Sequence, residues 1–436
     1  MSTQLLEKDK AYDRVLFHAA LLSNGRYGVL LDEAGSGYSR CDGVALTRWQ
    51  GDRIQNTDGF FVYLRDLDTG HFWSVGVQPT LVTPERYEAH CDPGRVTIAR
   101  LHMEIETRME ACVLCDADCE LRRIRLINHS TRLRHIELTS YLEVVAQWAA
   151  ADAAHPAFSK LFVQTEHDSG VLLARRRPRS AAESSPWVSA ALHGPGALSY
   201  ETDRVRFIGR GRDLSRPLAL NSIAPLSGTV GNVLDPVLSL RRIIALEPGV
   251  ETDCTLVLGV AVSREAARRL PNRWASGTAV GAAFAGAAAS EGALRQRLGL
   301  TADRAERLQA LGAALLYGDP ALRAAPEIVT RARGRLSDLH RWGLSGSVRF
   351  VLAQPPSDLA PERLRDLVQA QSYWAEKGLT VDLVVLAEDV PQALADQQRA
   401  ELERLTLPHG SCTRPRSQPS SSSFWRLRRI ASLGKR

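Results

Sequence analysis

The feature that most constrains this chain is a long series of short apolar or alternating segments between Leu21 and Val262. Gly, Asp or Pro interrupts the series roughly every ten residues, which is typical of antiparallel strands joined by turns. Asp68-Thr69-Gly70 separates two aromatic-rich segments and ends with the glycine that a tight hairpin favours. The series is too long for a seven-stranded immunoglobulin-like sandwich. It therefore predicts a mainly β chain, with one large antiparallel sandwich of two sheets over residues 21–262 and helices only after Ser263.

The pattern changes after Ser263 from strand-like to helical. Leucines recur at the spacing of one helical face, at Leu308, Leu311, Leu315 and Leu316. Further along, two apolar runs flank a helical segment that ends at Gly378, which is the arrangement of a βαβ unit with two parallel strands. We therefore predict a helical connector over residues 263–339 and a partial α/β linker over residues 340–408.

The two ends of the chain lack the pattern of a folded segment. Residues 1–20 form a lead-in without the apolar region of a signal peptide, and residues 409–436 are rich in Ser, Pro and Arg and are expected to be disordered. The net charge of the chain is +6, but seven basic residues and no acid lie in this tail, so the rest of the chain has a net charge of about −1. Nucleic-acid binding would depend on the tail alone, and we expect no nucleic-acid partner.

Neither membrane insertion nor disulfide bonding is expected for this sequence. No apolar run reaches the roughly 18 residues that a membrane-spanning helix needs. The seven cysteines are scattered and odd in number, and no apolar leader precedes them. This pattern favours free thiols in a reducing compartment, so the expected location is the cytoplasm.

Two short motifs contain residue types that can bind metals. Cys112, Cys115 and Cys119 have the spacing C-x2-C-x3-C, but no second cysteine or histidine pair completes a zinc site. Asp116 and Asp118 lie between two predicted strands, where aspartate favours a turn. We interpret the cysteines as buried apolar residues and the aspartates as part of a hairpin. Since P-loop, nucleophile-elbow and dinucleotide-binding motifs are also absent, we predict no catalytic residue, cofactor or metal.

Aromatic and charged residues are concentrated in the first predicted strands. Aromatic rings stack on the apolar faces of sugars, and charged groups fix sugar hydroxyls through hydrogen bonds. The same residue types also occur in the cores of sandwiches, as buried tryptophans and as Arg–Asp pairs, so a structural role is the open alternative. The candidate carbohydrate-binding residues are Tyr38, Arg40, Arg48, Trp49, Tyr63, Arg65, Asp66 and Trp73.

Several long strings in the sequence resemble one known family in collinear order. The strings are residues 21–52, 59–80, 126–145 and 150–166, the last of which contains HPAFSKLFVQTE, and then residues 175–179, 313–323, 340–354 and 373–389. They resemble the supersandwich region of glycoside hydrolase family 94, formerly glycosyltransferase family 36. The similarity is greatest to the phosphorylase-like part of the cyclic β-1,2-glucan synthases.

The resemblance implies a fold and a division of labour. It implies a galactose-mutarotase-like supersandwich that helps to shape a sugar cleft, whereas an (α/α)6 barrel further along carries the general-acid aspartate and the phosphate pocket. This sequence stops in the α/β linker, so the resemblance transfers no catalytic residue to it. The glycosyltransferase domain and the membrane helices of the full-length synthases, which are inner-membrane proteins, have no counterpart here either.

These expectations combine into one interpretation and one alternative. We expect the β-glucan-binding supersandwich portion of a glucan synthase or glycoside phosphorylase, truncated before the catalytic barrel and not catalytic alone. Its expected partners are a β-glucan oligosaccharide and a catalytic (α/α)6 barrel domain or subunit. The alternative is a non-catalytic interaction scaffold that docks on a separately encoded catalytic subunit.

Overall fold

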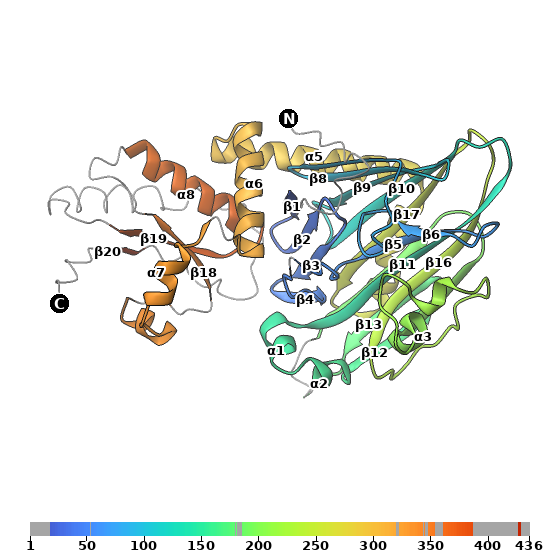
Figure 1. The fold of residues 1–436 in the computed structure, drawn as a ribbon, viewed down its shortest axis with the longest axis horizontal. Helices are drawn as coiled ribbons and strands as arrows, with labels where there is room; N and C mark the ends of the chain where they lie inside the picture. Colours follow the sequence, from blue (N-terminus) through green and yellow to red (C-terminus); the bar gives the residue numbers. More distant parts are fainter. Residues whose placement is uncertain are drawn as a thin grey trace. The chain divides into compact units, whose positions relative to one another are not determined.

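The computed structural model describes residues 18–52, 54–178, 180, 185–319, 322–342, 344, 348–353, 361–386 and 426–428. The chain divides into two compact units, Met1–Tyr317 and Gly318–Arg436. The first unit contains two large sheets and the helices that follow them, and the second contains a small sheet with helices (Figure 1).

The first sheet has nine strands, all paired in antiparallel fashion. Seven of them follow the order β1-β2-β3-β4-β11-β16-β15, while β5 pairs with β11 and with β6. Its strands are β1 (Ala19–Ser23), β2 (Tyr27–Asp32), β3 (Gly37–Cys41), β4 (Val44–Thr47), β5 (Phe61–Asp66), β6 (Phe72–Ser74), β11 (Arg134–Trp148), β15 (Leu198–Asp203) and β16 (Pro236–Leu246).

The second sheet has eight strands, also antiparallel, in the order β12-β13-β14-β17-β10-β9-β8-β7. Its strands are β7 (Arg86–Asp92), β8 (Arg95–His102), β9 (Ile105–Val113), β10 (Cys119–Asn128), β12 (Val163–Asp168), β13 (Val171–Arg176), β14 (Trp187–His193) and β17 (Glu251–Ala261). The mainly β, two-sheet antiparallel supersandwich predicted from the sequence is confirmed.

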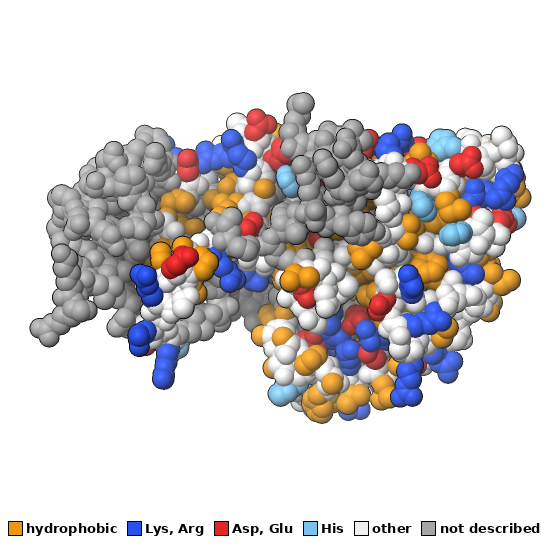
Figure 2. Space-filling model, viewed as in Figure 1, with side chains coloured by type: hydrophobic (Ala, Val, Ile, Leu, Met, Phe, Trp, Pro, Cys, Tyr) orange, Lys and Arg blue, Asp and Glu red, His pale blue; other side chains and the backbone are white. Residues whose placement is uncertain are grey.

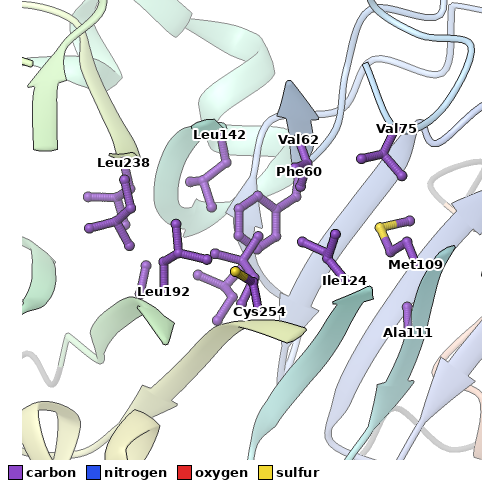
Figure 3. Close-up of a cluster of buried hydrophobic side chains, with 14 of the residues drawn as sticks. Phe60, Val62, Val75, Met109, Ala111, Ile124, Leu142, Leu192, Leu238 and Cys254 are labelled. Atoms are coloured by element: carbon purple, nitrogen blue, oxygen red, sulfur yellow. The ribbon is translucent and has the colours of Figure 1, made fainter. Parts of the chain in front are cut away.

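The hydrophobic core lies between the two sheets. Figure 3 shows Val62, Leu142 and Leu238 of the first sheet together with Ile124 and Leu192 of the second. All five side chains are buried. Burial of this apolar surface, at about 25 cal/mol per Å², is the main force that holds the sheets together.

The prediction that helices occur only after Ser263 is wrong. Three short α-helices lie inside the sandwich region, namely α1 (Ala149–Ala154), α2 (Pro156–Lys160) and α3 (Arg204–Ile208). Their causes are local. Before α1, a register shift between Val144 and Gln147 ends the regular part of β11. In α2, Pro156 occupies the first turn, where its missing N–H costs nothing. The Asp203 side chain caps α3 by accepting a hydrogen bond from the Val205 backbone N–H. Helices of five or six residues are too short to show the periodicity by which a sequence predicts them.

The predicted helices after Ser263 are present and pack on the sandwich. They are α4 (Arg264–Arg269), η2 (Leu270–Trp274), α5 (Gly277–Leu298) and α6 (Ala302–Tyr317). Trp274, Val280 and Ala287 bury themselves against Leu121 and Val257 on the outer face of the eight-stranded sheet. These helices therefore form part of the first unit.

The second unit contains the predicted βαβ arrangement. Strands β18 (Arg349–Ala353) and β19 (Val381–Leu386) are parallel and are connected through α8 (Pro361–Glu376), after which Gly378 adopts a φ of 75°. This unit also contains α7 (Pro326–Arg331) and η4 (Leu336–Trp342). A third strand, β20 (Arg426–Arg428), pairs with β19 in parallel. The other residues of the tail expected to be disordered, 409–425 and 429–436, lie outside the described residues. Within the described ranges, no helix is both long and apolar enough to cross a membrane.

Candidate functional site

The outer face of the nine-stranded sheet, opposite the core, carries polar and aromatic side chains. Successive residues of a strand point to opposite faces, so Ile136 and Leu138 of β11 lie in the core while Glu137, Tyr141 and Glu143 lie on the outer face. The segment from α3 to β16 packs over part of this face. The outer face is therefore divided into a covered part and a more open end.

The covered part is built around two tyrosines and Phe207 of α3. The Tyr141 ring lies 4.6 Å from the Phe207 ring, and the Tyr63 ring lies 6.2 Å from it. The Tyr63 hydroxyl donates a hydrogen bond of 2.9 Å to the carbonyl oxygen of Leu214. Tyr63, a predicted sugar-binding residue, is fully buried here, so it supports the segment that covers the sheet.

A buried ion cluster lies beside these rings. Nε of Arg241 is 3.1 Å from one oxygen of Glu137, and Nη1 of Arg65 is 4.0 Å from the other. Arg65 also donates a hydrogen bond of 2.7 Å to the carbonyl oxygen of Ser222 in the covering segment. Burial raises the pKa of Glu137, and the two guanidinium groups oppose that rise. Arg65 thus links the sheet to its cover.

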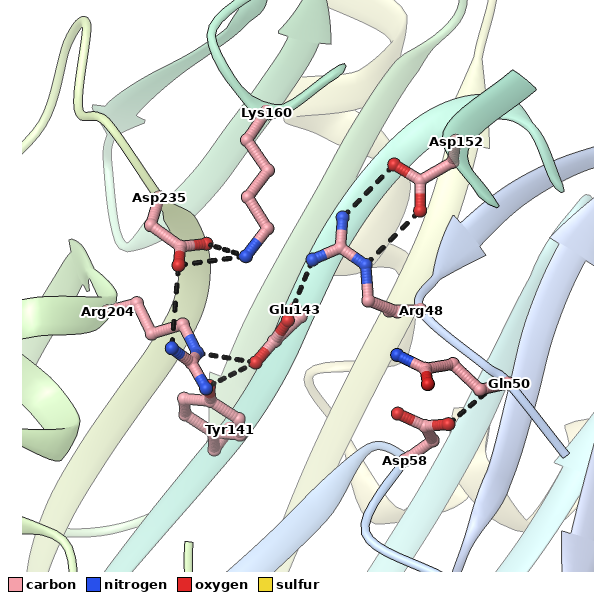
Figure 4. Close-up of polar contacts among 9 residues, drawn as sticks. All are labelled: Arg48, Gln50, Asp58, Tyr141, Glu143, Asp152, Lys160, Arg204 and Asp235. Atoms are coloured by element: carbon pink, nitrogen blue, oxygen red, sulfur yellow. Dashed lines mark hydrogen bonds and ion pairs between the residues drawn. The ribbon is translucent and has the colours of Figure 1, made fainter. Parts of the chain in front are cut away.

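The open end holds a network of six charged residues, which we call the Glu143 network (Figure 4). Its members are Arg48, Glu143, Asp152, Lys160, Arg204 and Asp235. Glu143 joins its two halves because one of its carboxylate oxygens lies 2.9 Å from Nη1 of Arg48 and the other lies 2.6 Å from Nε of Arg204. Arg48 also binds Asp152 with two hydrogen bonds of 3.1 and 3.2 Å. Asp235 lies 2.8 Å from Lys160 and 3.5 Å from Arg204.

Three cations and three carboxylates balance one another in this network. Burial favours the neutral acid, but Arg204, Arg48 and Lys160 outweigh it and hold the pKa of Glu143 below its ordinary value. The side chain of Arg48 is only 10% exposed, whereas that of Arg204 is 37% exposed. The network is therefore inside the protein at Arg48 and reaches the solvent at Arg204.

An aromatic corner adjoins the network at Trp49, the residue after Arg48. The Trp49 ring makes edge contacts with Tyr38, at 5.1 Å, and with Tyr317 of α6, at 5.8 Å. The guanidinium of Arg40 lies 4.9 Å from the centre of the Tyr38 ring. Trp49 and Arg40 are half-buried, and Tyr38 is buried with a hydroxyl group that has no hydrogen-bond partner among the described residues.

A backbone contact fixes the loop that follows this corner. The carboxylate of Asp58 accepts a hydrogen bond of 2.6 Å from the backbone N–H of Gln50. Burial raises the pKa of Asp58, and this hydrogen bond opposes the rise. The Gln50 side chain is exposed next to Trp49.

The last two predicted residues lie away from this end of the sheet. Asp66 is fully buried and forms an ion pair and hydrogen bond with Arg134, and the pKa of Asp66 is lowered because this bond and others to its carboxylate outweigh its burial. Trp73 is fully buried in the core, with its ring 5.0 Å from that of His102. Of the eight predicted residues, the structure thus brings together Tyr38, Arg40, Arg48 and Trp49.

Sequence reasoning missed the partners that complete the Glu143 network. Glu143 could have been noticed because it is an acid at an outward position of a long alternating strand. Asp152, Lys160 and Arg204 lie on the short helices α1, α2 and α3, which the pattern did not reveal. Their proximity to Arg48 depends on long-range folding, and no local spacing signals it.

The residues of the cysteine and aspartate motifs take part in packing and in ion pairs. Cys112 and Cys119 are fully buried and pack with Trp274, while Asp116 forms an ion pair with Arg273 and Asp118 forms one with Arg26. In the part of the chain that the structure describes, no group of three or more His, Cys, Asp or Glu residues could hold a metal ion.

Comparison with known proteins identifies the family of this chain and several relatives. Residues 9–277 match the family of glycosyl hydrolase 94 supersandwich domains. The chain is 32% identical over 384 residues to the cyclic β-(1,2)-glucan synthase NdvB of Rhizobium meliloti, a match that covers 87% of this chain and 14% of that protein.

Two phosphorylases are more distant relatives. Identity is 25% over 219 residues to the solabiose phosphorylase of Paenibacillus borealis, covering 49% of this chain and 27% of that enzyme. It is 25% over 245 residues to the N,N'-diacetylchitobiose phosphorylase of Vibrio furnissii, covering 55% and 30%. The chain thus spans less than a third of the length of each of these three relatives.

Proposed function

This chain belongs to glycosyl hydrolase family 94 through its supersandwich domain, and from that premise we propose that it is a carbohydrate-recognition module that contacts β-glucan oligosaccharides without supplying catalytic residues. The relative that matches most of the chain is named as a cyclic β-(1,2)-glucan synthase. A β-1,2-linked gluco-oligosaccharide is therefore the ligand that we assign to it. A catalytic barrel domain or subunit would carry out the chemistry.

The observation that carries this proposal is the succession in the chain of Arg48, which belongs to the Glu143 network, and Trp49, which belongs to the aromatic corner. A sugar ring offers an apolar C–H face, which stacks on an aromatic ring, and hydroxyl groups, which exchange hydrogen bonds with charged and amide groups. Trp49 offers a half-buried ring, Gln50 an exposed amide and Arg204 a partly exposed guanidinium. These groups lie on or next to one open end of a polar sheet face.

The ion pairs of the network prepare such a surface for binding. Because Glu143 and Asp152 hold Arg48, and Glu143 and Asp235 hold Arg204, the guanidinium groups lose little side-chain freedom when a ligand arrives. Affinity should still be weak, on the order of millimolar, because one face leaves much of the ligand in water.

The test is a titration of the purified chain with β-1,2-gluco-oligosaccharide by calorimetry. Trp49→Ala should weaken binding about fivefold, the equivalent of one aromatic contact of about 1 kcal/mol, and Gln50→Ala should weaken it less. Trp187→Ala is the matched control, since Trp187 is a half-buried tryptophan on β14 of the other sheet.

Two results would overturn the proposal. One is the absence of binding by a wild-type chain that unfolds cooperatively. The other is binding that Trp49→Ala and Trp187→Ala reduce equally, because the site would then lie elsewhere. Absence of binding would favour the scaffold that docks on a catalytic subunit.

A further inference from the structure

A pocket of about 440 Å³ lies between the end of β11, helices α1 and α2 and the end of β13, and its volume is in the range of small-ligand sites. We call it the α1–α2 pocket. It forms where β11 stops being regular, because Ala146 has a φ of 50° and the pairing with β4 shifts its register between Val144 and Gln147. Gln147 therefore lies in the pocket wall, just before the chain turns into α1.

One wall of the pocket is aromatic and open to the solvent. The rings of Phe158 and Phe162 meet edge to face at 4.9 Å, and both line the pocket. Phe162 is half-buried, whereas Phe158 is 61% exposed although it is a large apolar residue. An aromatic ring that is held in a pocket and remains exposed offers its face to the C–H face of a sugar ring.

Polar groups on the other walls suit sugar hydroxyl groups. The half-buried Gln147 amide and the exposed His155 imidazole both line the pocket, and both can donate and accept hydrogen bonds. Arg176 makes the wall behind them rigid, because it donates hydrogen bonds of 2.9 and 3.2 Å to the carbonyl and hydroxyl oxygens of Ser159, and its guanidinium carbon lies 5.1 Å from the centre of the Phe162 ring. The pocket thus combines an aromatic ring with amide and imidazole groups, which together fit a neutral sugar unit.

The same two helices also contact the Glu143 network. Asp152 of α1 points to Arg48, and Lys160 of α2 points to Asp235 (Figure 4). Two alanines of α1 and Phe158 of α2 line the pocket instead. The pair of helices thus joins the network with some side chains and forms the pocket with others, within the first compact unit.

Strand β11 connects the pocket to the aromatic corner as well. The backbone carbonyl of Glu143 accepts a hydrogen bond of 3.1 Å from the backbone N–H of Arg48, the residue before Trp49. Gln147 follows Glu143 along β11 at a distance of at most about 13 Å, given the rise of a strand, and pairs with Ala45 of β4. An oligosaccharide of several sugar units is long enough to contact both places.

We infer that the α1–α2 pocket is a second subsite for the gluco-oligosaccharide, so that one ligand chain contacts Trp49 with one sugar unit and Phe158 with another. The Gln147 amide and the His155 imidazole exchange hydrogen bonds with the hydroxyl groups of the second unit. The class of ligand in this inference rests on the proposed function. The second subsite goes beyond that function, because two subsites on one surface make affinity depend on the length of the ligand.

The test measures by calorimetry how the affinity of the full chain depends on the length of linear β-1,2-gluco-oligosaccharides. The disaccharide occupies one subsite at a time, whereas a longer chain can occupy both. The second contact of a longer chain is intramolecular, so we expect longer chains to bind about tenfold more tightly than the disaccharide. The gain should end once the ligand spans both subsites.

Variants separate the pocket from the rest of the surface. Phe158→Ala should abolish the gain in affinity with length, whereas Phe158→Tyr, which keeps the aromatic ring, should retain it. Leu133→Ala is the matched control, because Leu133 is a large apolar residue with 40% exposure that lies just before β11, at the opposite end of this strand from the pocket. Both positions are exposed, so these variants should keep the wild-type unfolding curve.

The outcomes distinguish this inference from the proposed function. If Phe158→Ala and Leu133→Ala bound every oligosaccharide equally well, the pocket would not be a subsite, and binding that still depended on Trp49 would leave the proposed function intact. Binding that depends on Phe158 but not on Trp49 would support the pocket and contradict the aromatic corner. Absence of binding by a wild-type chain that unfolds cooperatively would overturn both.

A second copy of the chain is the other occupant that the test can reveal. Sedimentation of the wild type and of Phe158→Ala measures whether the chain dimerises through this wall. A dimer that Phe158→Ala abolishes, together with affinity that does not depend on ligand length, would assign the pocket to an interface between two copies and overturn the inference.

Discussion

Glu143 connects the two halves of the Glu143 network, since one of its carboxylate oxygens contacts Arg48 and the other contacts Arg204. Glu143→Gln would keep the size of the side chain but leave three cations with two carboxylates. Removing one partner from a largely buried set of charges is costly, and we expect a loss of about 2 kcal/mol in the free energy of unfolding, measured by urea denaturation. The stabilisation belongs to the ionised form of Glu143, so it should be present above the ordinary pKa of glutamate and be lost as the pH falls through the lowered pKa.

Glu166 provides the control for this variant. Its ion pair with Arg264 has side chains 41% and 43% exposed, so water screens the pair and Glu166→Gln should change the free energy of unfolding very little. If Glu143→Gln and Glu166→Gln lowered the free energy of unfolding equally, the Glu143 network would not behave as a buried set of charges.

Glu33 gives the molecule a pH dependence of the opposite sign. Burial and the neighbouring Asp32 carboxylate raise the pKa of Glu33 to about 7, although the His18 imidazole lies 3.6 Å away. The folded state therefore holds a proton that the unfolded state has released, and stability falls as the pH rises from about 4.5 to about 7. Glu33→Gln should remove this loss, so its stability relative to the wild type should rise between pH 4 and pH 8 by on the order of 1 kcal/mol, after allowance for solvent screening.

The quantity to measure is the difference in the free energy of unfolding between Glu33→Gln and the wild type as a function of pH, because other groups also titrate. Burial lowers the pKa of His102 to about 4, which makes stability fall as the pH drops below about 6.5. That effect is the same in both proteins and cancels in the difference. A difference that stays constant with pH would contradict the raised pKa of Glu33.

At the scale of single residues, the sequence indicates which residue types could bind a sugar, but it does not indicate which of them are exposed. Arg48 and Trp49 were predicted to bind ligand and lie at an open end of the sheet, whereas Trp73 and Asp66 are fully buried. The exposure of a strand residue depends on what covers its face. Trp73 is covered by the opposite sheet, in the core between the two sheets, and Asp66 pairs with Arg134 of β11, so neither fact could be read from local sequence.

At the scale of elements, Gln309 of α6 completes the edge of the nine-stranded sheet. Its side-chain oxygen accepts a hydrogen bond of 2.6 Å from the backbone N–H of Leu21 in β1, and its side-chain nitrogen donates one of 3.0 Å to the Leu21 carbonyl. The helix thus supplies the pairing that an edge strand lacks. Gln309→Ala would leave both backbone groups without these partners, and we expect a loss of about 1–3 kcal/mol in unfolding free energy, with faster hydrogen exchange of the Leu21 amide.

Gln296 is the matched control for this substitution. It lies exposed on α5, so Gln296→Ala should change stability by less than about 0.5 kcal/mol. If the two alanine variants were equally stable, the side chain of Gln309 would not be an important part of the sheet edge.

Elements were predictable wherever a local signal was strong. The hairpin at Asp68-Thr69-Gly70 is present, since β5 and β6 pair in antiparallel fashion and Gly70 has a φ of 76°. The parallel pair β18 and β19 is likewise confirmed. What the sequence could not give was the order of strands in each sheet, because β11 pairs with β4, β5 and β16 from widely separated parts of the chain.

At the scale of the whole molecule, the helices after the sandwich belong to it structurally. Trp274, Val280 and Ala287 cover an apolar patch on the outer face of the eight-stranded sheet, and Gln309 completes the edge of the other sheet. The sequence pattern placed the end of the sandwich near Val262, where strand-like alternation stops. Contacts instead place the end of the first compact unit at Tyr317. We therefore propose that the folding unit is longer than the β pattern.

Three fragments would test where that folding unit ends. A fragment of residues 1–317 keeps both helix contacts, and we expect it to be soluble, rich in β structure by circular dichroism and cooperative in urea unfolding. A fragment of residues 1–262 loses the helices, which exposes Leu121 and Val257 and leaves Leu21 without Gln309, so it should aggregate or unfold at much lower urea concentration. A fragment of residues 1–277, ending where the family match ends, keeps Trp274 but lacks α5 and α6, and its stability should lie between the other two. If the 1–262 fragment were as stable as the 1–317 fragment, the helices would not stabilise the sandwich, and the end predicted from the strand pattern would be the correct one.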